Sequence, residues 1–157
     1  MRREWDLDSL IDSWTVLDAD RELIANKYGP TLLGFVLILK FFEIEARFPR
    51  HVGEIPPAAV DFVARQVKVD PAELAGYDFT GRTVKEHRRQ IRDHLGFRMF
   101  TRADEDKMIG WLAAQVCPSE LNEDRQRGAV LARCAAEKIE PPGRMDRIIA
   151  PCKRRRR

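Results

Sequence analysis

The segment TLLGFVLILKFFE, residues 31–43, gives the clearest indication of how this chain of 157 residues folds. Its apolar side chains cover nearly every side of a helical projection, and only Lys40 interrupts the central run. A helix that is apolar all round belongs at the centre of a domain. The run is shorter than the roughly 20 apolar residues that cross a bilayer. Because Gly29-Pro30 precedes it and Pro49 follows it, we predict a buried helix from Thr31 to about Arg47.

Helix signals recur on both sides of this stretch, whereas strand signals are almost absent. Capping residues, first-turn prolines and apolar positions at helical spacing mark the other helices. Thr83-Val84-Lys85-Glu86, for example, fits a capping box. We therefore predict an all-α fold of about eight helices, whose remaining members begin near Asp18, Pro57, Asp70, Thr83, Thr101, Ser119 and Arg144.

The segment from Tyr77 to Gly81 is the best candidate for a domain boundary. We predict two small helical subdomains of helix-turn-helix type, residues 1–79 and 80–150, and a disordered basic tail, residues 151–157. The helix, Gly-Pro turn and helix between Asp18 and Arg47 are compatible with that motif. Helix pairs joined by short turns also occur in most helical proteins, so the pattern has low specificity.

Charge is distributed unevenly along a chain whose net charge is only +3. Residues 1–20 have a net charge of −4, whereas residues 82–102 have +5 and residues 141–157 have +6. Two basic segments on a near-neutral chain are typical of a protein with a polyanionic partner. A solvated helix face explains the first basic segment equally well, and composition alone leaves the two interpretations open.

The helix predicted from Val84 to Leu95 combines an apolar face, which includes Ile91, with an adjacent row of basic residues, Lys85, Arg89 and Arg92. Such a helix suits the major groove of DNA, where Lys and Arg neutralise phosphates and Arg pairs with guanine. We expect Arg89 and Arg92 to be exposed there, and Lys27 to lie near a phosphate. The predicted DNA-binding residues are Arg82, Lys85, Arg88, Arg89, Arg92 and Arg98.

Motifs for metal binding and catalysis are missing from the sequence. His87 lies on the apolar face of its helix, where a hydrogen-bonded core histidine is the better interpretation. The three cysteines are far apart and show no spacing typical of a disulfide framework, which favours reduced thiols in the cytoplasm. We predict no enzymatic activity, no cofactor, no metal site, no small-molecule substrate and no membrane association.

Several motifs, in this order and spacing, resemble the N-terminal region of Tn-three-family replicative transposases. The resemblance extends from about Met1 to Ile149. It rests on W-x(8)-W at Trp5 and Trp14, Ala25-Asn26-Lys27, Leu39-Lys40-Phe41-Phe42-Glu43, Arg47-Phe48-Pro49, Glu54-Ile55-Pro56, Val63-Ala64-Arg65-Gln66, Tyr77-Asp78, Gly81-Arg82-Thr83, His87-Arg88, Ile91-Arg92, Leu95-Gly96-Phe97-Arg98 and Glu140-Pro141-Pro142-Gly143-Arg144.

The resemblance implies a function that residue patterns alone do not. Members of that family bind the terminal inverted repeats of a transposon through N-terminal helical modules, and cut DNA with an Asp/Asp/Glu site in a C-terminal domain. The chain resembles the first part only, as a truncated transposase would. The implied partner is double-stranded DNA in the bacterial cytoplasm, in association with the nucleoid. The alternatives are a decayed remnant without strong DNA binding and a protein–protein docking domain.

Overall fold

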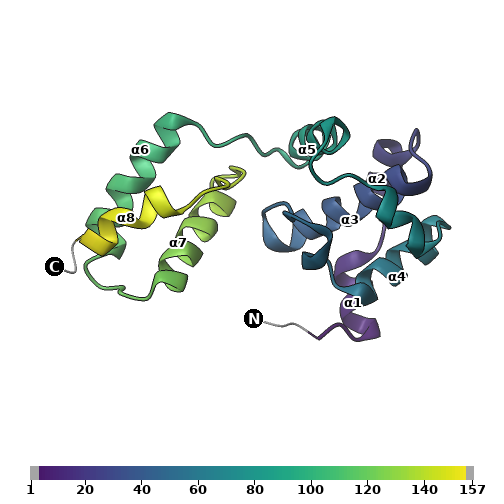
Figure 1. The fold of residues 1–157 in the computed structure, drawn as a ribbon, viewed down its shortest axis with the longest axis horizontal. Helices are drawn as coiled ribbons and strands as arrows, with labels where there is room; N and C mark the ends of the chain where they lie inside the picture. The colour runs from purple at the N-terminus through teal and green to yellow at the C-terminus, as the bar shows by residue number, and fades with distance from the viewer. Residues whose placement is uncertain (1–3, 155–157) are drawn as a thin grey trace. The chain divides into compact units, whose positions relative to one another are not determined.

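The computed structural model describes residues 4–154 and confirms the all-α prediction. Within those residues the only β-type pairing is an isolated bridge between Arg98 and Ile139. The chain divides into two compact units, Met1–Ile91 and Arg92–Arg157. Figure 1 labels the helices of both units. None of the helices between residues 4 and 154 is long and apolar enough to cross a membrane.

The first unit is built around the central helix that the apolar segment 31–43 predicts. This helix, α3 (Gly29–Glu45), lies against α1 (Leu7–Trp14), α2 (Asp18–Ile24) and α4 (Pro57–Val67) (Figure 1). All ten residues from 33 to 42 are buried. Short 3₁₀ turns, η1 (Val52–Glu54) and η2 (Pro71–Gly76), complete the unit together with the first part of α5 (Arg82–Leu95). The prediction of a central helix is confirmed.

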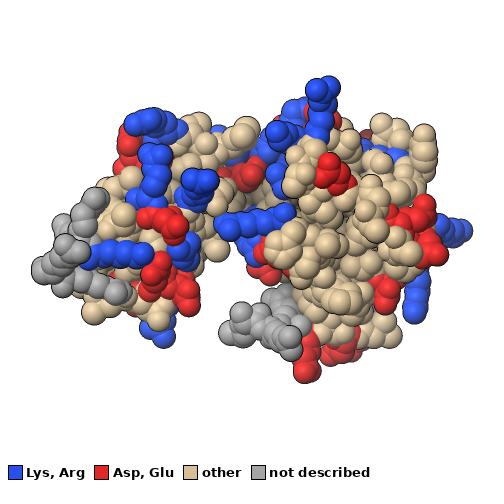
Figure 2. Space-filling view, viewed as in Figure 1, with Lys and Arg blue, Asp and Glu red and all other residues tan. Residues whose placement is uncertain are grey.

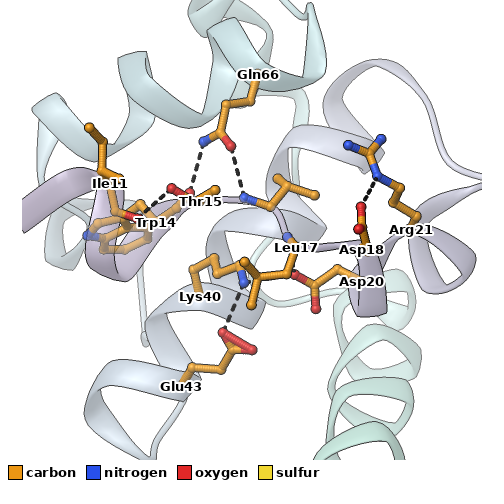
Figure 3. Close-up of polar contacts among 11 residues, drawn as sticks. Ile11, Trp14, Thr15, Leu17, Asp18, Asp20, Arg21, Lys40, Glu43 and Gln66 are labelled. Carbon is orange, nitrogen blue, oxygen red and sulfur yellow. Dashed lines mark hydrogen bonds and ion pairs between the residues drawn. The ribbon is translucent and has the colours of Figure 1, made fainter.

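Helix α1 was not predicted, and two local features explain it. Asp6 caps the helix by accepting a hydrogen bond of 2.8 Å from the Ser9 N–H. Leu10 and Trp14 then bury one face. The following turn is tied to α4 by Gln66, whose amide donates to the Trp14 carbonyl and accepts from the Val16 N–H, both at 2.9 Å (Figure 3).

A buried ion-pair cluster joins α2 to α3. Lys40 is only 1% exposed, and its Nζ lies 2.8 Å from Asp20 Oδ2 and 3.1 Å from Glu43 Oε2. Asp20 Oδ2 also accepts a hydrogen bond from the Leu17 N–H at the start of α2. Figure 3 shows the three charged side chains converging between the two helices. Lys40, the single cation within the apolar segment, therefore links α2 to the core helix α3.

The second unit contains α6 (Arg102–Trp111), the π-helical turn η3 (Leu112–Val116), α7 (Glu123–Ala136) and α8 (Asp146–Arg154). Its core includes Met108, Leu112, Val130, Cys134, Ile148 and Ile149. Three α-helices and one helical turn thus surround a separate apolar centre.

Two predictions, one about residues 151–157 and one about the three cysteines, are wrong in the second unit. Residues 151–154 belong to α8 instead of a disordered tail, because Cys152 is buried in the core of the second unit. The expectation of three reduced thiols also fails, since Cys152 forms a disulfide with Cys117, whose Cα atom is 4.7 Å away. Cys134 remains a free thiol, and its burial raises its pKa to about 11. The rest of the predicted tail, residues 155–157, lies outside the described residues.

The division between the units falls between Ile91 and Arg92, inside α5, whereas the sequence placed a boundary near residue 79. The reason is the buried face of α5: Val84, His87 and Ile91 all pack in the first unit. The first three turns of this helix therefore belong structurally to the residues before it.

Candidate nucleic-acid interface

Helix α5 is anchored to the first unit by a small aromatic cluster. The Tyr77 hydroxyl and His87 Nδ1 are 2.7 Å apart and buried, and the two rings are stacked. Phe35 of α3 meets the His87 ring edge-on, with ring centroids 4.9 Å apart. A neutral imidazole accepts the phenolic proton at Nδ1. The predicted hydrogen-bonded core histidine is confirmed, and its partner is a tyrosine that precedes the helix.

Room for the tyrosine ring comes from a glycine in the middle of α3. A Cβ atom added to Gly34 would lie 2.6 Å from Tyr77 Cδ2 and closer still to Cδ1, far inside van der Waals contact. Glycine normally weakens a helix interior. Here it permits the close approach of Tyr77, and through Tyr77 it determines where His87 and α5 lie.

Two further side-chain contacts hold α5 in place. Lys27 Nζ donates to Gln90 Oε1 and to the Leu23 carbonyl, both at 2.9 Å, and lies 4.3 Å from the centre of the Phe35 ring. Arg88 is only partly exposed, and its guanidinium carbon lies 5.6 Å from the centre of the Phe48 ring. Lys27 and Arg88 thus have partners within the first unit, and their geometry favours a role in positioning the helix.

The start of α5 differs from the predicted capping box. The helix begins at Arg82, so Thr83 is its second residue instead of its cap. Asp78 organises the preceding turn, because its Oδ1 accepts hydrogen bonds from the Thr80 N–H and the Thr80 hydroxyl, both at 2.8 Å. The turn that presents Arg82 is therefore defined before the helix starts.

The exposed face of α5 brings together three of the predicted DNA-binding residues. Arg82, Lys85 and Arg89 are all exposed and lie at spacings of three and four residues, which places them on one side of the helix. Figure 2 shows Lys and Arg side chains grouped over the surface of α5, at the top of the view. Arg89 forms an ion pair with Glu86 on the same face. We call Arg82, Lys85 and Arg89 the basic strip.

Arg92 and Arg98 lie elsewhere and are already paired within the second unit. The Arg92 side chain is only 12% exposed, and its Nη1 lies 2.7 Å from Glu140 Oε1, so the expectation that Arg92 is exposed is wrong. Arg98 binds both carboxylate oxygens of Asp104, at 2.6 and 2.8 Å. These bonds hold the pKa of Asp104 well below its ordinary value. Both arginines pair with carboxylates outside α5, which the spacing of residues along one helix could not reveal.

The anchoring cluster makes stability depend on pH. Burial, followed by repulsion from Lys27, lowers the pKa of His87 to about 4, and Glu86 opposes that shift only weakly. The unfolded pKa is about 6.5, so the neutral ring stabilises the fold above that value and the stability is lost as pH falls toward 4. Lowering the pH from 7 to 4.5 should remove about 2 kcal/mol of unfolding free energy through this group.

Urea unfolding of His87→Gln at both pH values checks this expectation, with Trp111→Phe as background so that tryptophan emission reports the first unit. Glutamine retains an acceptor for Tyr77 but does not titrate. The variant should lose about 2 kcal/mol less than its parent on acidification. Equal losses in the two proteins would show that carboxylates alone cause the acid sensitivity.

No cluster of three or more His, Cys, Asp or Glu side chains suited to a metal ion occurs among the residues that the structure describes. The sequence interpretation assigned no role in positioning α5 to Gly34 or Tyr77. No pattern in the neighbouring sequence indicates this role, because it depends on the close packing of Gly34 in α3 against Tyr77 before α5.

Fold and surface define an all-α chain of two compact units with one strongly basic exposed helix. The chain belongs to the family described as a domain of unknown function, DUF4158, which residues 1–150 match.

Two relatives extend the comparison, and both are transposases. The chain is 29% identical to the transposase for transposon Tn501 of Pseudomonas aeruginosa over 143 residues, which are 88% of this chain and 14% of that protein. It is 32% identical to the transposase for transposon Tn21 of Escherichia coli over 130 residues, 80% of this chain and 12% of that protein. The resemblance to a transposase region is confirmed, and the chain spans only a small part of these relatives' length.

Proposed function

We propose that this chain binds double-stranded DNA at the ends of a transposon through helix α5. The observation that carries the proposal is the basic strip, three exposed cations on one face of a helix whose opposite face is locked by the Tyr77–His87 bond. The similarity to transposases for Tn501 and Tn21 supports DNA as the polyanion and transposon ends as its source. The working location would be the bacterial cytoplasm, on DNA.

A rigid helix suits this task because its charges are positioned before DNA arrives. Little ordering entropy then opposes binding. The side chains of Arg82 and Lys85 have no hydrogen bond or ion pair in the described part of the chain, so phosphates can bind these side chains directly. Arg89 lies in an exposed pair with Glu86, a contact worth little in water, and can exchange that carboxylate for a phosphate or a guanine edge.

The other three predicted DNA-binding residues are less available to DNA than the basic strip, because each already contacts another side chain. Arg88 lies over Phe48 in the first unit and Arg92 pairs with Glu140 in the second, and moving either side chain to DNA would break that contact. Arg98 would have to release Asp104, whose carboxylate also accepts the Thr101 N–H bond at the start of α6. We assign these three residues to positioning.

Within this proposal the chain recognises DNA and performs no bond-breaking step. Several of its carboxylates are occupied as caps and ion-pair partners, as Asp6 is with Ser9 and Glu123 is with Arg127. Strand cutting would belong to another part of a transposase.

Replacing Arg82, Lys85 and Arg89 together by alanine should weaken DNA binding and flatten its dependence on salt. Each phosphate contact that is lost should lower the slope of log K against log salt by about 0.9. If all three side chains contact phosphate, the slope therefore falls by almost three. Fluorescence anisotropy with labelled duplexes measures this, using the terminal repeats of Tn501 and Tn21 and scrambled duplexes of equal composition.

Arg65→Ala is the matched control, because Arg65 is an exposed arginine on α4, away from the strip. It should leave affinity and slope nearly unchanged, and the triple variant should keep its helical circular-dichroism signal. Replacing a residue that contacts a base edge should also reduce the preference for the terminal repeat over the scrambled duplex. The expected reduction is about 1–3 kcal/mol of binding free energy for each such residue. A triple variant with parental affinity at every salt concentration would refute the assignment of α5.

A further inference from the structure

The two tryptophans of the W-x(8)-W motif have no part in the basic strip, yet the structure brings them together. The Trp5 and Trp14 rings meet edge-on, with centroids 5.7 Å apart. Both line a cavity of about 460 Å³ whose walls also include Phe41, Ile44, Glu45 and Glu54. Cavities of 300–1,000 Å³ with aromatic walls and a few polar groups are typical of binding sites.

The two charged residues that line this cavity, Glu45 and Glu54, are acidic, and Glu54 is paired with Arg47. Every charged residue from position 4 to position 20 is an aspartate or a glutamate, and Figure 2 shows acidic side chains at the lower edge of the first unit. On α1, Leu7 and Ile11 are 64% and 48% exposed, at helical spacing with Trp14. Such a surface repels nucleic acid and complements a segment that is basic and apolar.

Two residues of the cavity lining, Phe41 and Glu54, already bind a guanidinium group from the chain itself. Arg47 lies over the Phe41 ring, 5.2 Å from its centre, while its Nη2 is 2.8 Å from Glu54 Oε1. An aromatic face together with a carboxylate is the combination that binds arginine. Trp5 and Glu45 offer the same pair of groups on the cavity wall. Trp5 is partly exposed. Glu45 is exposed, and its side chain has no hydrogen bond or ion pair in the described residues.

We propose that this cavity docks an arginine side chain from a partner protein segment with apolar neighbours. The guanidinium would lie against Trp5 and pair with Glu45, while the neighbouring side chains pack on Leu7 and Ile11. The site is independent of the DNA-binding proposal, since it is built from α1, α3 and the residues before α4 and uses no residue of α5. It gives the acidic first helix a role as a protein-docking surface.

Nuclear magnetic resonance of the tryptophan indole N–H groups tests this proposal on the full chain. The probe is the peptide acetyl-Ala-Leu-Arg-Leu-Ala-amide, with glutamine in place of arginine in a second peptide. The arginine peptide should shift the Trp5 and Trp14 signals in a saturable way and leave Trp111, in the second unit, unaffected. The glutamine peptide should bind about tenfold more weakly, because it lacks both the ion pair and the cation–π contact.

Glu45→Gln should weaken binding of the arginine peptide about three- to fivefold without loss of helical signal. Glu22→Gln, at an exposed glutamate on α2, is the matched control and should bind as the parent does. The triple variant of the basic strip should also bind the peptide normally, which separates this result from any failure of DNA binding. Absence of a saturable shift, equal affinity for the two peptides, an unaffected Glu45→Gln variant, or displacement of the peptide by duplex DNA would each overturn the proposal.

Discussion

Replacing Lys40 by methionine is expected to lower the unfolding free energy of the first unit by about 3–5 kcal/mol. The Lys40 side chain is 2% exposed and Asp20 is 3% exposed, so the substitution leaves a buried carboxylate without its cation. Removing one partner of a buried pair costs far more than the pair contributes, because the remaining charge keeps its desolvation penalty. Urea unfolding followed by tryptophan emission, with Trp111→Phe as background, measures the loss.

Two companion variants show whether the uncompensated charge causes that loss. Asp20→Asn combined with Lys40→Met removes both charges and keeps an acceptor for the Leu17 N–H, so it should recover a substantial part of the stability. Lys85→Met, at an exposed lysine on α5, should change stability by no more than about 0.5 kcal/mol. A double variant as unstable as Lys40→Met alone would indicate that packing, instead of charge, accounts for the effect.

Gly34→Ala is the second substitution with a large expected effect. Its Cβ atom would meet the Tyr77 ring far inside van der Waals contact, so either the ring or the backbone of α3 must move. Overpacking of a core costs about 1–3 kcal/mol and sometimes more. Displacement of Tyr77 would also break its bond to His87, so the variant should lose the anchoring of α5. Urea unfolding measures the stability, and hydrogen exchange of the α5 amides measures the anchoring.

The control for this prediction is another helical glycine. Gly128 of α7 has nothing within 4 Å of the position that an alanine methyl group would take, so alanine there should stabilise the second unit by about 0.5–1 kcal/mol. The Gly34→Ala and Tyr77→Ala changes should also be strongly non-additive, because removing the ring removes the clash. Additive losses would show that the tyrosine is not the group that Gly34 accommodates.

Several features of the fold were predictable because they depend on local composition. A stretch of this length that is apolar on nearly every side favours a core helix, which is why the predicted position of α3 is confirmed. The spacing of Val84, His87 and Ile91 identified the buried face of α5 in the same way. Helix α1 was missed because its signals are weak: a short segment with only Leu10 and Trp14 buried, among many aspartates.

Side-chain contacts between distant residues could not be predicted from the sequence. A charged residue looks the same in sequence whether it faces water or a partner. Arg92 was therefore expected to be available to DNA, although its partner Glu140 lies 48 residues further along the chain. Cys117 and Cys152 likewise gave no pattern, because 35 residues separate them and only the packing of the second unit brings them together.

The helical class, the central position of α3 and the two faces of α5 follow from the sequence alone, because periodicity and apolar content act within single helices. Only the tertiary structure decided how the charges are used. It buried Lys40 against Asp20, paired Arg92 and Arg98, and left Arg82 and Lys85 on the exposed face of α5. The physical reason is that an ion pair or a close approach depends on side chains from different elements, whose positions follow from the packing of the whole unit.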